Sequence, residues 1–212
     1  MLVLASASPR RQELLCNAGI EFVVHPADLP EIPQEGELPR GFAERMAREK
    51  ALAVFALRPN DLILGADTVV VVDGEILGKP RDAADAARML RLLSGRKHEV
   101  VTGVCIVKAP GLKPLASRLG GTAEAVPFHG RSDDTVVDVR SESTTVTMGA
   151  LSDDDIRSYV ASSEPMDKAG AYAIQGMASR WIPRIEGDYF NVVGLPVALV
   201  WRMLQESQGK AV

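Results

Sequence analysis

An Asp-Gly pair between two apolar runs constrains the fold of this chain more than any other feature of its sequence. Residues 69–72 and 75–77 are almost wholly apolar, and Asp73 and Gly74 between them suit a two-residue turn joining antiparallel strands. Elsewhere short apolar strands alternate with amphipathic helices, which is typical of an α/β protein. Because the hairpin is antiparallel, the sheet is predicted to be mixed rather than wholly parallel.

The remaining elements follow from apolar periodicity and from helix start and stop signals. Further strands are predicted at residues 2–5, 20–24, 62–66, 98–107, 144–148 and 181–185. Helices are predicted at residues 9–18 and 41–57, from Asp82 to Gly95, from Ser152, and from Pro196 with Val197, Val200, Trp201 and Leu204 facing inward. Residues 109–141 are rich in Pro, Gly, Ser and charge, so we interpret them as a loop or hairpin insertion, with 135–139 as its only strand-like part.

Composition limits the classes of function. With 212 residues, 46% of them hydrophobic, the chain can bury a substantial core, as one domain of two lobes that share a sheet. Its net charge of −4, without a basic block, argues against a nucleic-acid or membrane partner. Two isolated cysteines and the lack of a leader or a long apolar run predict a soluble, cytoplasmic protein.

Two arginines stand where a helix start disfavours them. Ser8 and Pro9 have the character of an N-cap and a first helical residue, so Arg10 and Arg11 fall in the first turn, which costs about 0.3–1 kcal/mol per cation. A bound anion would explain the arrangement, because the free N–H groups, the hydroxyls of Ser6 and Ser8 and two guanidinium groups all suit phosphate oxygens. The alternative is that both arginines point to water.

Lys50 lies in the middle of the apolar stripe of the predicted helix 41–57. It either extends past the core to solvent or reaches into a cleft to meet a negative ligand. Asp67 follows an apolar strand, and a two-residue turn at Asp73-Gly74 would place Thr68 opposite Lys79 and so bring Lys79 beside Asp67. Lys79 would then hold the pKa of Asp67 low, although an ordinary exposed ion pair is the alternative.

Gln175 lies in the glycine-containing stretch DKAGAYAIQG, and its amide could both donate to and accept from a pyrimidine edge. A glutamine in such a loop is otherwise simply solvated. The three histidines lack metal-ligand spacing, and the dinucleotide, P-loop, zinc-protease and serine-hydrolase motifs are missing.

Taken together, these stretches resemble a known family, the Maf-type nucleoside triphosphate pyrophosphatases. The resemblance covers about residues 1–107 and 144–204 and rests on LASASPRRQELL, AREKA, LGADTVVVVDGEILGKP, LSGRKHEVVTGV, YVASSEPMDKAGAYAIQG and IEGDYFNVVGLP. It implies an elongated mixed β-sheet flanked by helices, two lobes with a central cleft, and hydrolysis of a nucleoside triphosphate to the monophosphate and pyrophosphate. It also implies a divalent cation, Mg²⁺ or Mn²⁺.

The resemblance assigns roles to particular residues. Arg10, Thr68 and Gln175 resemble the family branch that acts on dTTP and UTP, rather than the branch that prefers 7-methyl-GTP. Asp67 matches the catalytic proton acceptor. The other matching cleft residues are Ser8, Arg11, Glu31, Lys50 and Lys79.

On this basis we expect a triphosphate held by cations, with Lys50 and Lys79 assisting Asp67 in catalysis and with Glu31 and Asp67 as metal ligands. Two features depart from the family pattern: Pro30 replaces an acid before Glu31, and the insertion at 109–141 is longer than usual. A nucleotide-binding regulator of cell division or septum formation, acting through a protein partner, is the alternative function. A homodimer is left open.

Overall fold

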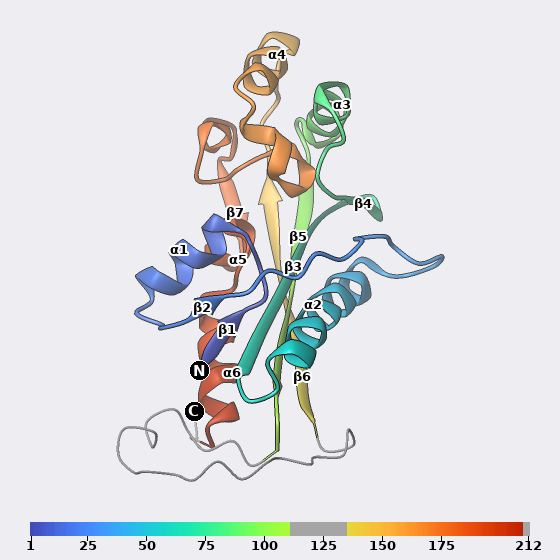
Figure 1. Cartoon of the computed structure of the whole chain (residues 1–212). Coiled ribbons are helices and arrows are strands. Elements are labelled where there is room, and N and C mark those ends of the chain that lie inside the picture. Colours follow the sequence, from blue (N-terminus) through green and yellow to red (C-terminus); the bar gives the residue numbers. More distant parts are fainter. Residues whose placement is uncertain (111–134, 210–212) are drawn as a thin grey trace.

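Seven strands form one mixed sheet in the computed structural model, which describes residues 1–110 and 135–209 (Figure 1). The order is β2-β1-β3-β5-β6-β7, and β4 pairs with β3. β1 is parallel to β2 and to β3, whereas the other neighbours are antiparallel, which confirms the predicted mixed sheet. The strands are β1 (Leu2–Leu4), β2 (Val23–Val24), β3 (Leu62–Val72), β4 (Glu75–Leu77), β5 (Lys97–Lys108), β6 (Val136–Thr147) and β7 (Arg184–Glu186).

Helices cover both faces of this sheet. Short 3-10 turns follow α4 and lead to β7. The helices are α1 (Pro9–Asn17), α2 (Pro39–Leu57), α3 (Ala83–Leu93), α4 (Asp153–Ala161), α5 (Tyr189–Val193) and α6 (Val197–Ser207), with 3-10 turns η3 (Glu164–Asp167), η4 (Ala169–Ala171) and η5 (Met177–Trp181).

The Asp-Gly hairpin forms as predicted but is shorter than expected. Val72 pairs with Glu75 and Val70 with Leu77, in the predicted register. The pairing ends at Leu77 because the chain then turns away, and the Gly78 carbonyl accepts from the backbone N–H of Gly170 (3.1 Å) instead. The prediction that Thr68 faces Lys79 across this ladder is therefore wrong.

The boundary of the insertion also needs correction. β6 is a single strand that pairs with β5 over its whole length, from Thr147 opposite Lys97 to Val136 opposite Lys108. Its outer half, VVDVRS, falls within the predicted insertion, where only residues 135–139 have a strand-like pattern. Alternation of polar and apolar residues there suits a half-exposed strand. Residues 111–134, the rest of the predicted insertion, lie outside the described residues.

Two glycines let α2 pack very closely against one face of the sheet. A Cβ atom at Gly65 would lie 2.2 Å from the Ala47 carbonyl oxygen, and one at Gly103 would lie 2.3 Å from that of Ala43. Small side chains on α2 complete this contact, as Ala47 and Ala51 are fully buried. This close packing fixes which residues of α2 can reach β3.

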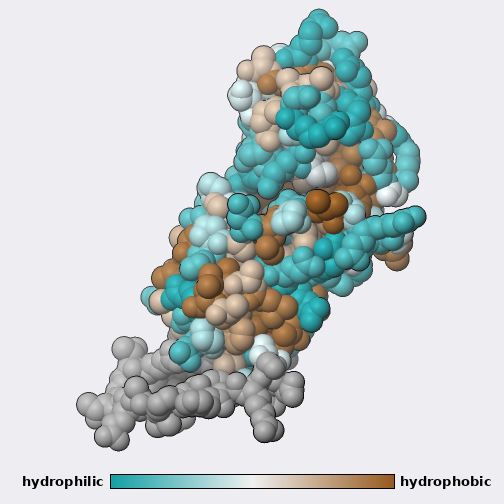
Figure 2. All heavy atoms as spheres, turned by 45° about the vertical axis from the view of Figure 1, so that its right-hand side comes forward, coloured by the Kyte–Doolittle hydropathy of each residue, from teal (hydrophilic) through white to brown (hydrophobic). Residues whose placement is uncertain are grey.

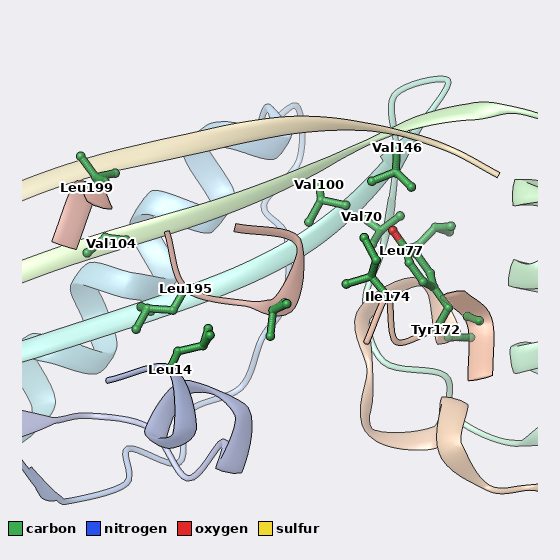
Figure 3. Packing of buried hydrophobic residues seen from close by; sticks show 14 of the residues in the cluster. Leu14, Val70, Leu77, Val100, Val104, Val146, Tyr172, Ile174, Leu195 and Leu199 are labelled. Carbon is green, nitrogen blue, oxygen red and sulfur yellow. The ribbon is translucent and has the colours of Figure 1, made fainter. Parts of the chain in front are cut away.

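The opposite face carries the larger core, which joins α1, α3, α4 and α6 to the sheet. Figure 3 shows part of it, with Leu14 and Leu195 below β3 and β5, and with Tyr172 and Ile174 beside Val70. The inward face predicted for the last helix is rotated from the observed one. Its buried residues are Leu199, Val200, Met203 and Leu204, and Trp201 is 52% exposed.

The molecule is elongated, and β5 and β6 run along most of its length (Figure 1). α3 and α4 lie at one end, whereas α1, α2 and α6 surround the other part of the sheet. Figure 2 shows that the surface of the α3–α4 end is mostly hydrophilic. The description of the whole molecule as one domain of two lobes remains a prediction. Within the described residues, no helix combines the length and the apolar character needed to cross a membrane.

Candidate active site

The candidate site lies where one edge of β3 is left unpaired. β5 occupies the other edge, while on this edge β1 pairs with residues 62–64 and β4 with residues 70–72. Within the described part of the chain, residues 65–69 have no strand partner here. Asp67 and Thr68 lie in this gap, and because successive strand residues point to opposite faces, they reach the opening from the two sides of the sheet.

A cleft of about 840 Å³ opens at this gap. It is lined by the start of α1, the loop before α2, the middle of α2, β3, and the chain around η4 and α5. The structure thus brings together all of the residues that the sequence singled out. They are Ser8, Arg10, Arg11, Glu31, Lys50, Asp67, Thr68, Lys79 and Gln175.

Lys50 enters the cleft and does not extend to water. α2 approaches β3 closely at Gly65, and Lys50 Nζ lies 2.6 Å from Asp67 Oδ1. The same Nζ atom is 2.5 Å from Glu31 Oε1. The side chains of Lys50 and Asp67 are only 8% and 7% exposed. One buried ammonium group is therefore shared by two carboxylates.

Burial and charge act differently on these two carboxylates. Burial raises the pKa of Asp67 above its ordinary value, and this effect outweighs the lowering by the charges of Lys50 and Arg11. Burial also acts to raise the pKa of Glu31, but the hydrogen bond and charge of Lys50, with Lys79 and Arg11, bring it below its ordinary value. The prediction that the pKa of Asp67 is held low is therefore wrong.

Lys79 does not lie beside Asp67 as predicted. Its Nζ atom is 3.7 Å from Glu31 Oε2, and its side chain is 58% exposed. The hairpin ladder ends before this residue, so Lys79 reaches the cleft from a loop. Lys50, from a helix distant in sequence, takes the place next to Asp67 that was predicted for Lys79.

Arg11 is fixed in direction by three neutral acceptors. Its Nε donates to the Gly194 carbonyl (2.8 Å), Nη1 to Ser6 Oγ (3.1 Å) and Nη2 to Thr68 Oγ1 (3.0 Å). Burial lowers the pKa of Arg11, while the charges of Asp67 and Glu31 act in the opposite direction. A guanidinium stays charged in proteins, so its remaining N–H groups form a positioned cation.

The start of α1 differs from the prediction in its details. Ser8 is the N-cap residue, but its hydroxyl does not cap the helix; its backbone N–H instead donates to Ser6 Oγ (3.2 Å). The first-turn N–H groups thus lack a side-chain cap. Arg10 crosses the cleft, and its Nη1 donates to Asp167 Oδ2 (2.9 Å). The two arginines therefore neither point to water nor act as one pair.

Gln175 is exposed on the wall of the cleft that η3 and η4 form. Two residues that sequence reasoning missed hold its loop. The carboxylate of Glu164 accepts from the N–H of Met177 (3.0 Å) and from the hydroxyl of Tyr159 (2.8 Å), and that hydroxyl accepts from the N–H of Ala173 (3.1 Å). A carboxylate next to a glycine-containing loop was the available signal.

Lys168, within the stretch DKAGAYAIQG, is a further cleft residue that sequence reasoning missed. It lines the cleft, and its Nζ atom contacts Asp167 Oδ1 (2.5 Å) and the Glu164 carbonyl (2.6 Å). It thereby joins the carboxylate that holds Arg10 to the segment that holds Gln175. Its position next to Asp167 in the sequence was the signal that could have indicated this link.

Fold and site together define a mixed-sheet α/β protein whose cleft gathers cations around a buried carboxylate. Residues 1–207 match the family model described as Maf-like protein. The chain belongs to the Maf family.

Relatives share about half of its residues. A protein of Koribacter versatilis named dTTP/UTP pyrophosphatase is 51% identical, over 97% of this chain and 94% of its own length. A protein of the same name from Syntrophomonas wolfei is 49% identical, over 95% of this chain and 94% of its own length. A solved structure of a nucleoside-triphosphatase / dITP/XTP pyrophosphatase from Mycobacterium abscessus is 14% identical, with a TM-score of 0.37 over 71% of this chain and 75% of that one.

Proposed function

We propose that this chain is a nucleoside triphosphate pyrophosphatase that hydrolyses dTTP and UTP to the monophosphate and pyrophosphate. The observation that carries the proposal is the buried carboxylate of Asp67 at the centre of a cleft that Arg11, Lys50 and Lys79 also line. The names of relatives that match nearly the whole chain support it. Several cations gathered in one cleft are what a polyphosphate requires.

The cations of the cleft hold the triphosphate in this proposal. Arg11 is directed by its three acceptors, and the uncapped N–H groups at the start of α1 add further donors. Arg10 and Lys79 also line the cleft, where they pair with Asp167 and Glu31. These groups offset the charge that develops on the leaving pyrophosphate.

Asp67 accepts a proton from the water that attacks the α-phosphorus. A bond forms between the water oxygen and this phosphorus, and the bond to the oxygen that bridges to the β-phosphorus breaks. A general base works best when its pKa is not far below the working pH, and burial raises the pKa of Asp67 in that direction. Lys50, in contact with Asp67, orients the carboxylate.

A divalent cation fits the cleft only in company with the substrate. The described residues contain no group of three or more His, Cys, Asp or Glu side chains that could hold a metal ion. Glu31 and Asp67 supply carboxylate oxygens of the kind that Mg²⁺ or Mn²⁺ takes, often from one or two carboxylates plus substrate phosphates. When bound, such an ion would neutralise phosphate charge. These two residues would hold it.

The nucleobase is placed at the wall that carries Gln175. The amide of Gln175 can donate and accept at a pyrimidine edge, and Thr68 lines the same cleft. Arg10, held by Asp167, contributes to the same selectivity. A purine would be excluded by the shape of this space.

A panel of nucleoside triphosphates with product analysis tests the proposed reaction. Purified protein with Mg²⁺ or Mn²⁺ is expected to convert dTTP and UTP to the monophosphate with release of pyrophosphate. Release of orthophosphate instead would indicate stepwise removal of phosphate groups. Failure to cleave any common nucleotide with either metal would refute the proposal.

Substitution Gln175→Ala is expected to change selectivity more than rate. Loss of one amide contact to the base should lower the kcat/KM ratio of UTP to ATP about tenfold, the size of one neutral hydrogen bond. Steady-state kinetics with both nucleotides measures this ratio. Gln205→Ala, on α6 away from the cleft, is the matched control, and an unchanged ratio in Gln175→Ala would contradict the base contact.

A further inference from the structure

A buried chain of hydrogen bonds leads from the cleft into the sheet. Arg11 Nη2 donates to Thr68 Oγ1 (3.0 Å), which lies 3.0 Å from Thr102 Oγ1, and Thr102 Oγ1 donates to the Asn191 carbonyl (3.1 Å). Thr68 and Thr102 are paired residues of β3 and β5. Thr102 is fully buried and does not line the cleft, so it acts on a substrate through a neighbour, and Thr68 is the neighbour whose side chain it contacts.

The chemistry of these groups fixes the direction of the chain. A carbonyl oxygen can only accept, so the single hydroxyl hydrogen of Thr102 belongs to its bond with Asn191. The Thr68 hydrogen then points to the inner side, where the Thr102 oxygen at 3.0 Å is the nearer acceptor. The Gly194 carbonyl, at 3.4 Å, is a second acceptor on the same inner side. Since Arg11 uses one lone pair of Thr68, what Thr68 offers to the cleft is its other lone pair.

We propose that Thr102 is a positioning residue that determines specificity, because it makes Thr68 an acceptor toward the nucleobase. Uracil and thymine carry an N–H donor at position 3, whereas cytosine carries an acceptor there. The fixed Thr68 oxygen therefore favours UTP and dTTP over CTP. This inference rests on the proposed function and on Thr68 facing the base. An acceptor facing a phosphate oxygen would be repelled, which argues against a phosphate contact for Thr68.

The test compares the kcat/KM ratio of UTP to CTP in the wild type, Thr102→Val and Thr102→Ser. Valine keeps the shape of threonine but removes the nearer acceptor. The Gly194 carbonyl that remains is 3.4 Å away and already accepts from Arg11 Nε, so the Thr68 hydroxyl is freer to turn its hydrogen toward cytosine. We expect the ratio to fall about tenfold in Thr102→Val, mainly through KM. Serine retains the hydroxyl, so Thr102→Ser should keep the wild-type ratio.

Thr144→Val is the matched control for loss of a buried hydroxyl. Thr144 is 1% exposed and accepts from Asn191 Nδ2 (3.0 Å), on the next strand, without contacting Thr68. The variant Thr144→Val should lower thermal stability as Thr102→Val does, but it should leave the kcat/KM ratio of UTP to CTP unchanged. A change of the ratio as large as that in Thr102→Val would overturn the proposal.

A measurement on the wild type keeps the inference testable even if Thr102→Val does not fold. UTP methylated at N3 lacks the donor and should be cleaved about tenfold less efficiently than UTP methylated at C5. Equal cleavage of UTP and CTP by the wild type would overturn the inference while the pyrophosphatase function stands. Equal loss with both nucleotides in Thr102→Val would assign the Thr68 acceptor to the ribose and also overturn it. Only a wild type inactive on every nucleotide would refute the function itself.

Discussion

Asp67→Asn is expected to lower kcat for dTTP and UTP about 100- to 10,000-fold, the contribution of a positioned general base, while nucleotide binding stays within a few-fold of the wild type. Asparagine has the same shape as aspartate, and its amide oxygen can still accept from Lys50, so the packing around the 2.6 Å contact is retained. What disappears is the proton acceptor. Single-turnover kinetics gives the rate of the chemical step, and calorimetric titration with nucleotide gives the affinity.

Asp167→Asn is a matched control, because Asp167 is a carboxylate of the same cleft that contacts Arg10 and not Lys50. This variant should change KM and leave the chemical step nearly intact. Turnover by Asp67→Asn at the wild-type rate with saturating nucleotide would show that Asp67 is not the base. The regulator alternative would require Asp67→Asn to leave every cellular effect intact while Arg10→Ala abolishes it.

Lys50→Met is expected to reduce both activity and stability. At neutral pH it leaves the buried carboxylate of Asp67 without the cation that contacts it, and loss of one partner of a buried ion pair costs about 3–5 kcal/mol of folding free energy. Activity should fall at least about 100-fold, because Asp67 loses the group that orients it. Denaturant unfolding and steady-state kinetics measure the two effects.

The pH dependence of this variant follows from the sign of the pKa change. Without Lys50 the pKa of Asp67, already raised by burial, rises further in the folded protein, so the folded state binds a proton that the unfolded state releases. The stability lost relative to the wild type should therefore be largest at high pH and shrink as the pH falls through the raised pKa. The acid limb of the activity profile should move to higher pH.

Lys79→Met is the matched control for Lys50→Met. It removes a lysine of the same cleft that is 58% exposed and 3.7 Å from Glu31, so its stability should change by less than about 1 kcal/mol. Its KM for nucleotide should still rise. Equal stability of Lys50→Met and the wild type across pH 5–9 would contradict the burial of an unpaired Asp67.

Local patterns in the sequence were sufficient to predict most of the strands and helices of the fold. The Asp73-Gly74 turn predicts its own register because turn geometry and alternation act over a few residues. β6 was recognised only in part, because its polar outer half depends on pairing with β5, which the local sequence does not show. Trp201 was assigned to the wrong face of its helix because a window of four apolar residues allows more than one stripe.

The residues that line the site could be predicted from the sequence, but the contacts among their side chains could not. The resemblance to a family identified the residues of the cleft, including Glu31 and Gln175. Which cation contacts Asp67 depends on how closely α2 approaches the sheet, and Gly65 and Gly103 control that distance through packing. The contacts of Thr102 likewise depend on the β3–β5 register, a long-range property.

Because the site is built on the unpaired stretch of β3, its activity depends on the correct register of that strand. Asp67 and Thr68 lie on opposite faces of this strand. Asp67 contacts Lys50, and Thr68 contacts Arg11. Sliding β3 by a single residue would turn each side chain to the opposite face. A slide in one direction would place Thr68 against Lys50 and Val69 against Arg11, and a slide in the other would place Ala66 against Lys50 and Asp67 against Arg11. Misaligned molecules would be inactive even where they remain compact, so specific activity is a sensitive assay of how faithfully a preparation has assembled its sheet.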